Sequence, residues 1–195
     1  SAKLYKMLLD AKNSKFICLT ATPIVNKVFE AAKLFNILRG KIHYTQFKIK
    51  FIFAADIDYR KIKQELLKDR QIDQVIINKI NKTIKITFNP EGYLTSIDPD
   101  KKGVVYAKNS PALKTHDEIQ KNASDVLTKL GYKFDMSKSY ETALPDDEDE
   151  FNSYFYNPDL NKIKKKELFK KRIANLTSFY DYKDPELFPR LKSTT

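Results

Sequence analysis

The residues best suited to exchanging hydrogen bonds lie in a short polar segment, Thr20-Ala21-Thr22-Pro23, directly after the apolar run Phe16–Leu19. A short apolar run without alternation is typical of a strand buried on both faces, as in a parallel sheet. Hydroxyls at the carboxyl end of such a strand can switch partners, and α/β sheets place ligands at that end. Thr20 and Thr22 are therefore candidate functional residues. The alternative is that the segment is only the exit of a strand.

A second candidate is a basic stretch near the C-terminus. From about Leu160 to Tyr180 apolar residues recur at helical spacing, which predicts an amphipathic helix with a basic outer side. Phosphate contacts there would release counterions and give salt-dependent, sequence-independent binding. The candidate side chains are those of Lys164, Lys165, Lys166, Lys170, Lys171 and Arg172. The alternative is a solvated face of a helix that packs through its apolar side.

The composition excludes several kinds of site. Among 195 residues, the single Cys18 excludes an internal disulfide framework, and two distant histidines, His43 and His116, do not indicate a histidine-rich metal site. Neither GxxxxGK[ST] nor GxGxxG occurs, so the sequence holds no glycine-rich phosphate loop. No apolar run is long enough to span a membrane. The net charge of +11 favours a polyanionic partner.

The elements around the threonine segment fit an α/β unit. Leu4, Met7, Leu8 and Ala11 predict an amphipathic helix at the start of the chain. A second helix is predicted from about Val28 to Arg39, with Gly40 as its C-cap. We expect Cys18 to be a small core residue of the strand before it.

The middle of the chain predicts a different arrangement. A strand over 47–53 has Phe on one face and Lys on the other, so the Phe face is expected in the core. Asp58 could cap a helix to about Asp69, strands follow at 75–77 and 84–88, and a capping box at 115–118 opens a helix closed by Gly131. With a last short strand at 132–134, the order βαββαβ matches a ferredoxin-like split βαβ unit. The acidic run 147–150 is expected to be a solvated loop.

The segment from Ser14 to Arg39, SKFICLTATPIVNKVFEAAKLFNILR, closely resembles motif III of superfamily 2 helicases, in the form found in the Swi/Snf-like branch. The resemblance implies that Thr20 and Thr22 couple ATP hydrolysis to movement on nucleic acid, and that Asn26 contacts the nucleic acid. A second segment, Phe169–Tyr180 with Ala143–Asp146 before it, resembles the lead into the second lobe of helicases from nucleocytoplasmic large DNA viruses that act in transcription.

These resemblances imply a division of the chain. Residues 1–42 would be the C-terminal part of a RecA-like first lobe with a parallel sheet, 43–136 an inserted ferredoxin-like α+β subdomain, and 137–195 a linker and basic helix leading into lobe two. The fold class expected is thus α/β with an α+β insertion. The phosphate loop, the acidic motif for magnesium and the arginine for the γ-phosphate would lie outside these residues.

The function implied is that of an internal fragment of a DNA-dependent ATPase, or helicase-like translocase, of viral origin and acting in transcription. ATP and Mg²⁺ would be cofactors of the longer protein and would not be bound by this chain alone, which we expect to be inactive. The partners would be DNA or RNA and a viral RNA polymerase or transcription factor subunit, with no membrane. The location would be intracellular, in the host cytoplasm or the virion. The alternative is a non-enzymatic module that binds nucleic acid or a polymerase.

Overall fold

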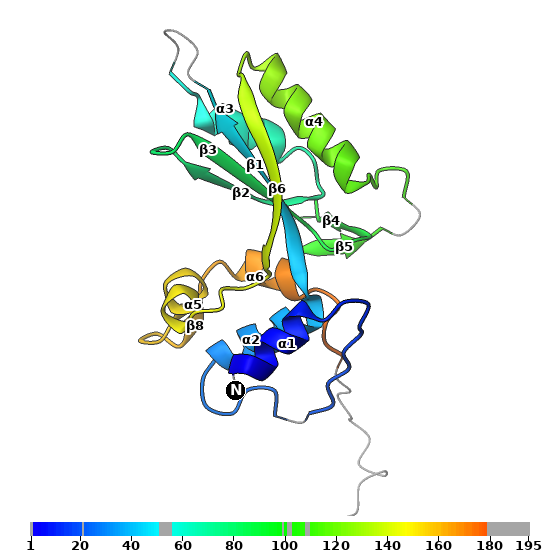
Figure 1. Ribbon diagram of the computed structural model, residues 1–195, viewed down its shortest axis with the longest axis vertical. Coiled ribbons are helices and arrows are strands. Elements are labelled where there is room, and N and C mark those ends of the chain that lie inside the picture. Colours follow the sequence, from blue (N-terminus) through cyan, green and yellow to red (C-terminus); the bar gives the residue numbers. More distant parts are fainter. Residues whose placement is uncertain are drawn as a thin grey trace, which may run out of the picture.

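The computed structural model describes residues 2–20, 22–50, 56–98, 100, 103–107 and 110–178. These residues form two parts, a sheet with two helices and a smaller group of helices (Figure 1). Helix α6 (Lys166–Ile173) lies between the two parts. No described helix is long and apolar enough to cross a membrane.

The sheet part is built from four antiparallel strands in the order β2-β3-β1-β6. Helices α3 and α4 contact each other and pack on the sheet through the same apolar cluster. The element order is βαββαβ, as the sequence predicts. The bounds are β1 Lys41–Ile49, α3 Tyr59–Leu66, β2 Ile72–Asn78, β3 Thr83–Phe88, α4 His116–Lys129 and β6 Phe134–Thr142.

Alternation of side chains decides which sheet face the helices cover. Phe47 and Ile49 are buried in the core with Ile62 of α3 and Leu127 of α4, whereas Lys48 between them is exposed. This confirms the expectation that the Phe face is core. The predicted strand over 47–53 is shifted, because β1 starts at Lys41; residues 51–55 lie outside the described part.

The helix caps in the sheet part follow the sequence signals. The Asp58 side chain accepts the Lys61 N–H, and Thr115 and Glu118 form the complete capping box at the start of α4. A small hairpin of β4 (Tyr93–Thr95) and β5 (Val104–Tyr106) lies beside this end of the sheet. The last strand is much longer than the predicted 132–134, since β6 pairs with β1 along its whole length.

The helical part has a core of its own. Phe29 and Ala32 of α2 pack with Leu144 and with Phe151 and Phe155 of α5. Gly40 follows α2 with a positive φ and its N–H donates to the Asn36 carbonyl, which confirms the predicted C-cap. The elements are α1 Ala2–Asp10, α2 Phe29–Arg39, α5 Glu148–Phe155, β7 Tyr156–Asn157, β8 Lys162–Ile163 and α6.

Two predictions in this part are wrong in the structure. Residues 16–19 form no strand, and Ile17 and Leu19 are 87% and 94% exposed, with Cys18 also exposed. A strand needs a neighbour to pair its backbone groups, and no described strand runs beside this one. Every strand pairing in the described residues is antiparallel, so the expected parallel sheet is not seen.

The region after residue 145 also differs from the prediction. The acidic run is not a loop, because Asp147 caps α5 and Glu148, Asp149 and Glu150 form its first turn, where the helix dipole favours negative charge. The helix predicted for 160–180 is shorter, because β8 occupies 162–163 and α6 runs only from Lys166 to Ile173. Tyr180 lies outside the described residues.

Candidate nucleic-acid interface

The threonine segment is an exposed stretch of coil that leads into α2. Thr20, Thr22 and Asn26 are all exposed. The Thr22 N–H donates to the Thr20 hydroxyl at 3.0 Å, a local turn in which a side chain substitutes for backbone pairing. The hydroxyl of Thr20 is therefore held by a weak, solvent-exposed bond that it can exchange for another.

Glu30 ties the end of this segment to the first turn of α2. Its Oε2 accepts the N–H groups of Val25 at 2.9 Å and Asn26 at 3.2 Å. These two hydrogen bonds lower the pKa of the Glu30 carboxyl, because they favour its charged form. The backbone of Asn26 is thus fixed while the residue itself stays exposed.

A buried asparagine, which the sequence analysis did not single out, organises the helical part. Asn36 is fully buried on α2; its Nδ2 donates to the Leu144 carbonyl and to Asp146, both at 2.9 Å, and its Oδ1 accepts the Leu144 N–H at 2.8 Å. Tyr5 of α1 bonds to both Asn36 and Asp146. Burial, then the Asp146 hydrogen bond, raise the pKa of Tyr5. An Asn inside an apolar helical pattern was the available signal.

The basic residues predicted to form one face are separated by the structure. Lys164 donates to the carbonyls of Asn152 and Ser153, at the C-terminal end of α5, where a cation is favoured. Lys165 lies over the ring of Tyr154. Lys171 donates to the Thr95 hydroxyl at 3.0 Å, and burial lowers the pKa of its ammonium group.

Arg172 is buried, which corrects its prediction as a phosphate contact. Its side chain is 6% exposed, its Nε lies 2.7 Å from Oδ2 of Asp73, and the Asp73 side chain is 1% exposed. That contact is an ion pair without hydrogen-bond alignment. The other guanidinium nitrogens donate to Thr87 at 2.9 Å and to the Ala143 carbonyl at 3.1 Å. The arginine therefore fastens α6 to the sheet and is not available to a ligand.

Lys166 and Lys170 remain as free cations of α6. They are four residues apart, so they lie on one side of the helix. Both are exposed, and neither has an ion-pair partner within the described ranges. These two lysines are the part of the predicted basic surface that can meet phosphates.

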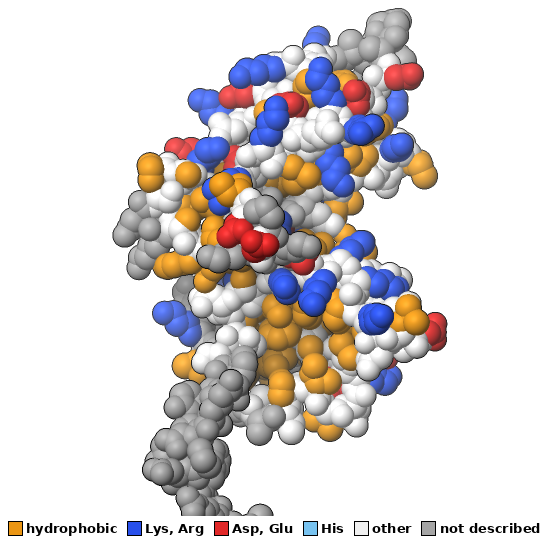
Figure 2. All heavy atoms as spheres, turned by 180° about the vertical axis from the view of Figure 1, so that it is seen from behind, with side chains coloured by type: hydrophobic (Ala, Val, Ile, Leu, Met, Phe, Trp, Pro, Cys, Tyr) orange, Lys and Arg blue, Asp and Glu red, His pale blue; other side chains and the backbone are white. Residues whose placement is uncertain are grey.

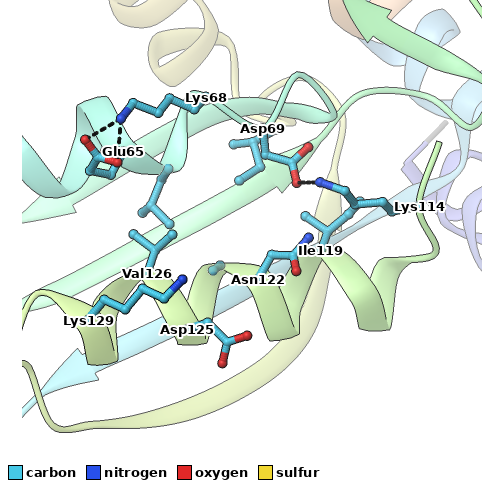
Figure 3. Close-up of a pocket in the computed structure, with 12 residues that line it drawn as sticks. Glu65, Lys68, Asp69, Lys114, Ile119, Asn122, Asp125, Val126 and Lys129 are labelled. Atoms are coloured by element: carbon cyan, nitrogen blue, oxygen red, sulfur yellow. Dashed lines mark hydrogen bonds and ion pairs between the residues drawn. The ribbon is translucent and has the colours of Figure 1, made fainter. Parts of the chain in front are cut away.

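A pocket of about 360 Å³ between α3 and α4 is less suited to a charged ligand (Figure 3). Two of its lysines already form ion pairs. The Lys68 ammonium lies 2.6 Å from the Glu65 carboxylate, and the Lys114 ammonium lies 2.8 Å from the Asp69 carboxylate. Among the described residues, no group of three His, Cys, Asp or Glu side chains could hold a metal ion.

Comparison with known protein families finds a match. The family model for the SNF2-related domain matches residues 1–133. This range includes the threonine segment, α2 and most of the sheet part, and it ends just before β6. No curated protein and no solved structure matches the chain.

Proposed function

Because the chain belongs to the SNF2-related family, a family of DNA-dependent ATPases and translocases, we propose that it is part of an ATP-driven motor on DNA. The observation that carries this proposal is the family match, which spans the threonine segment. In this function Thr20 and Thr22 couple hydrolysis to movement, and Asn26 contacts DNA. ATP and Mg²⁺ are held by residues outside this sequence, which has no glycine-rich phosphate loop.

The exposed apolar residues of the segment support a larger fold. The side chains of Ile17 and Leu19 are almost fully exposed to water, and burying them would lower the free energy of the folded protein. Figure 2 shows further hydrophobic side chains gathered on the back of the helical part. We propose that residues 16–19 become a strand of a RecA-like parallel sheet when neighbouring strands are present, and that the sheet part is an insertion in that lobe.

The finer assignment is to a helicase of nucleocytoplasmic large DNA viruses that acts in transcription, with a viral polymerase or transcription factor subunit as partner. It rests on the resemblance of residues 143–146 and 169–180 to those proteins. Copurification of the protein with a viral polymerase from infected cells tests this assignment. Recovery of the protein with cellular chromatin in place of the polymerase would overturn it.

We predict that replacing both threonines by valine, Thr20→Val with Thr22→Val, will reduce DNA-stimulated ATP hydrolysis of the protein encoded by the intact gene at least about tenfold. Valine keeps the shape and removes the hydroxyl that exchanges hydrogen bonds. Hydrolysis without DNA should change much less, because the segment acts in coupling. The matched control is Thr128→Val, at an exposed position of α4. Equal DNA stimulation in the double variant and the wild type would remove the coupling role.

We predict that reversing the two free charges, Lys166→Glu with Lys170→Glu, will weaken DNA binding and flatten its salt dependence. Each lost phosphate contact lowers the slope of log K against log salt by about 0.9, so the pair should lower it by about 2. Fluorescence anisotropy of a labelled duplex over a salt series measures the slope. Lys121→Glu with Lys129→Glu, exposed on α4, makes the same charge change elsewhere. Similar slopes for both pairs would mean that α6 makes no specific contact.

The alternative of a non-enzymatic binding module is favoured by one observation. The sheet part has a hydrophobic core of its own, from Phe47 to Leu127, that includes no residue of the threonine segment or of α2. The sequence of the intact gene separates the two functions. A GxxxxGK[ST] motif followed by an acidic motif before Thr20 supports the motor, and an unrelated sequence there supports the module.

A further inference from the structure

A row of aromatic rings lies at the end of the sheet that faces the helical part. His43 of β1 lies between Tyr140 of β6 and His116 of α4, with ring centroids 4.3 Å and 5.0 Å away, and Phe88 of β3 lies 5.1 Å beyond His116. Strand register explains part of the row, because His43 and Tyr140 are directly opposite each other. The capping box fixes the remaining ring, since His116 is the first residue of α4.

The row is anchored at one end and open at the other. Phe88 is 6% exposed and belongs to the core, whereas His43 and His116 are exposed and Tyr140 is 59% exposed. Core side chains therefore hold the row in place while its outer rings remain in contact with water. Large aromatic rings kept in solvent at fixed spacing are suited to stack on another flat ring.

Two hollows are lined in part by His116. One, of about 660 Å³, is lined by Phe88, Tyr106 and Leu113 among others, and the second, of about 330 Å³, by Arg39, Lys41 and His43. Both volumes fall in the range of small-ligand pockets, about 300–1,000 Å³. Each hollow is thus large enough to hold a flat group of the size of a nucleobase at the edge of the row.

The charges around the row are of both signs. Lys138 binds Asp117 at 2.8 Å and Lys41 binds Asp10 at 2.5 Å, both in exposed pairs. Exposed ion pairs are weak, so either lysine can turn to a phosphate at little cost. Glu91 lines both hollows, and the row is therefore not a strongly cationic surface.

Burial, then His116 and Lys138, lower the pKa of His43, which favours its neutral form. Because charges of both signs surround the row, its exposed aromatic rings are the feature best suited to recognise a ligand.

We propose that the rings of Tyr140, His43 and His116 bind unpaired bases of single-stranded DNA. Base stacking on aromatic side chains needs bases that are free of a partner strand, and it tolerates any sequence. The three rings belong to β1, β6 and α4, and not to the threonine segment or to the Lys166 and Lys170 pair, although Arg172 of α6 borders the smaller hollow. The inference goes beyond the proposed ATPase function. Its test uses no ATP hydrolysis, so its failure would leave that function untouched.

The first test uses the absence of tryptophan from the sequence. Tyr140→Trp in the full 195-residue chain places a single tryptophan at the open end of the row and keeps a stacking ring. Addition of a single-stranded 12-mer of thymidine should quench its emission at concentrations at least about tenfold below those needed for thymidine monophosphate. A duplex of equal length should not quench it.

The control is Tyr44→Trp, on the opposite sheet face of β1, which should not be quenched by the single strand. Equal quenching at both positions, equal affinity for the mononucleotide and the strand, or quenching by the duplex would each overturn the proposal.

The second test measures affinity without a reporter residue. Tyr140→Ala should weaken binding of the labelled single strand by about tenfold or more, the loss of one stacked base, whereas Tyr140→Phe should bind as the wild type does. Because Tyr140 is 59% exposed, Tyr140→Phe should unfold at the same temperature as the wild type, and Tyr140→Ala, which loses the ring contact with His43, within about 4 °C of it. Unchanged affinity in the alanine variant would contradict the proposal.

Discussion

Replacing Arg172 by methionine is expected to lower the free energy of unfolding by about 3–5 kcal/mol. The change leaves the carboxylate of Asp73, whose side chain is 1% exposed, buried without its charged partner. The Ala143 carbonyl also loses its hydrogen bond from the guanidinium. For a chain of this length the melting temperature should fall by roughly 6–20 °C, which calorimetry or circular dichroism measures.

The control for this prediction is Lys170→Met on the exposed side of the same helix, where the change should be within about 0.5 kcal/mol. A double variant, Arg172→Met with Asp73→Leu, should recover part of the loss, because a buried pair can be replaced by apolar groups more easily than it can be broken. Equal stability of Arg172→Met and Lys170→Met would show that α6 is not fastened to the sheet by this pair.

Arg172 also links the two parts of the molecule through the backbone. The Nε of Arg39 at the end of α2 donates to the Arg172 carbonyl at 3.0 Å, and its Nη2 donates to the Ala174 carbonyl. The side chain of Arg172 contacts Asp73 of β2 and Thr87 of β3. Loss of Arg172 should therefore loosen the junction between the parts as well as destabilise the fold.

Replacing Asn36 by leucine is expected to destabilise the chain by about 2–6 kcal/mol. The N–H and carbonyl of the buried Leu144 both lose their partner, and each unsatisfied buried group costs about 1–3 kcal/mol. Asp146 loses one hydrogen bond as well. Because Asn36 connects α1, α2 and residues 144–146, the helical part should become more accessible, and limited proteolysis should cut residues 11–28 faster.

The matched control is Asn122→Leu, which makes the same change on the partly exposed surface of α4 and should alter stability by less than about 0.5 kcal/mol. Proteolysis of residues 11–28 should be unaffected in that variant. If Asn36→Leu unfolds at the same temperature as Asn122→Leu, the buried network does not hold the helical part together.

Local sequence signals predicted the elements that depend on neighbouring residues. The capping box at Thr115, the cap at Asp58 and the C-cap at Gly40 are all confirmed, since each is made by side chains or backbone a few residues away. The Phe face of β1 was predicted for the same reason, because alternation along one strand fixes its two faces. The βαββαβ order follows from these local patterns, and the SNF2-related family from the residues of the threonine segment.

Only the tertiary structure decided which groups meet across long sequence distances. The sequence predicted Arg172 as part of a basic surface, whereas its burial depends on Asp73, a residue almost one hundred positions earlier. The contacts among Tyr140, His43 and His116 depend in the same way on strand register and on where α4 begins. Residues 16–19 have the apolar pattern of a strand but form none, because no described strand lies beside them to pair with their backbone groups. The sequence by itself determined the local elements and the family. Partners supplied by distant segments determined burial, charge pairing and the arrangement of the aromatic row.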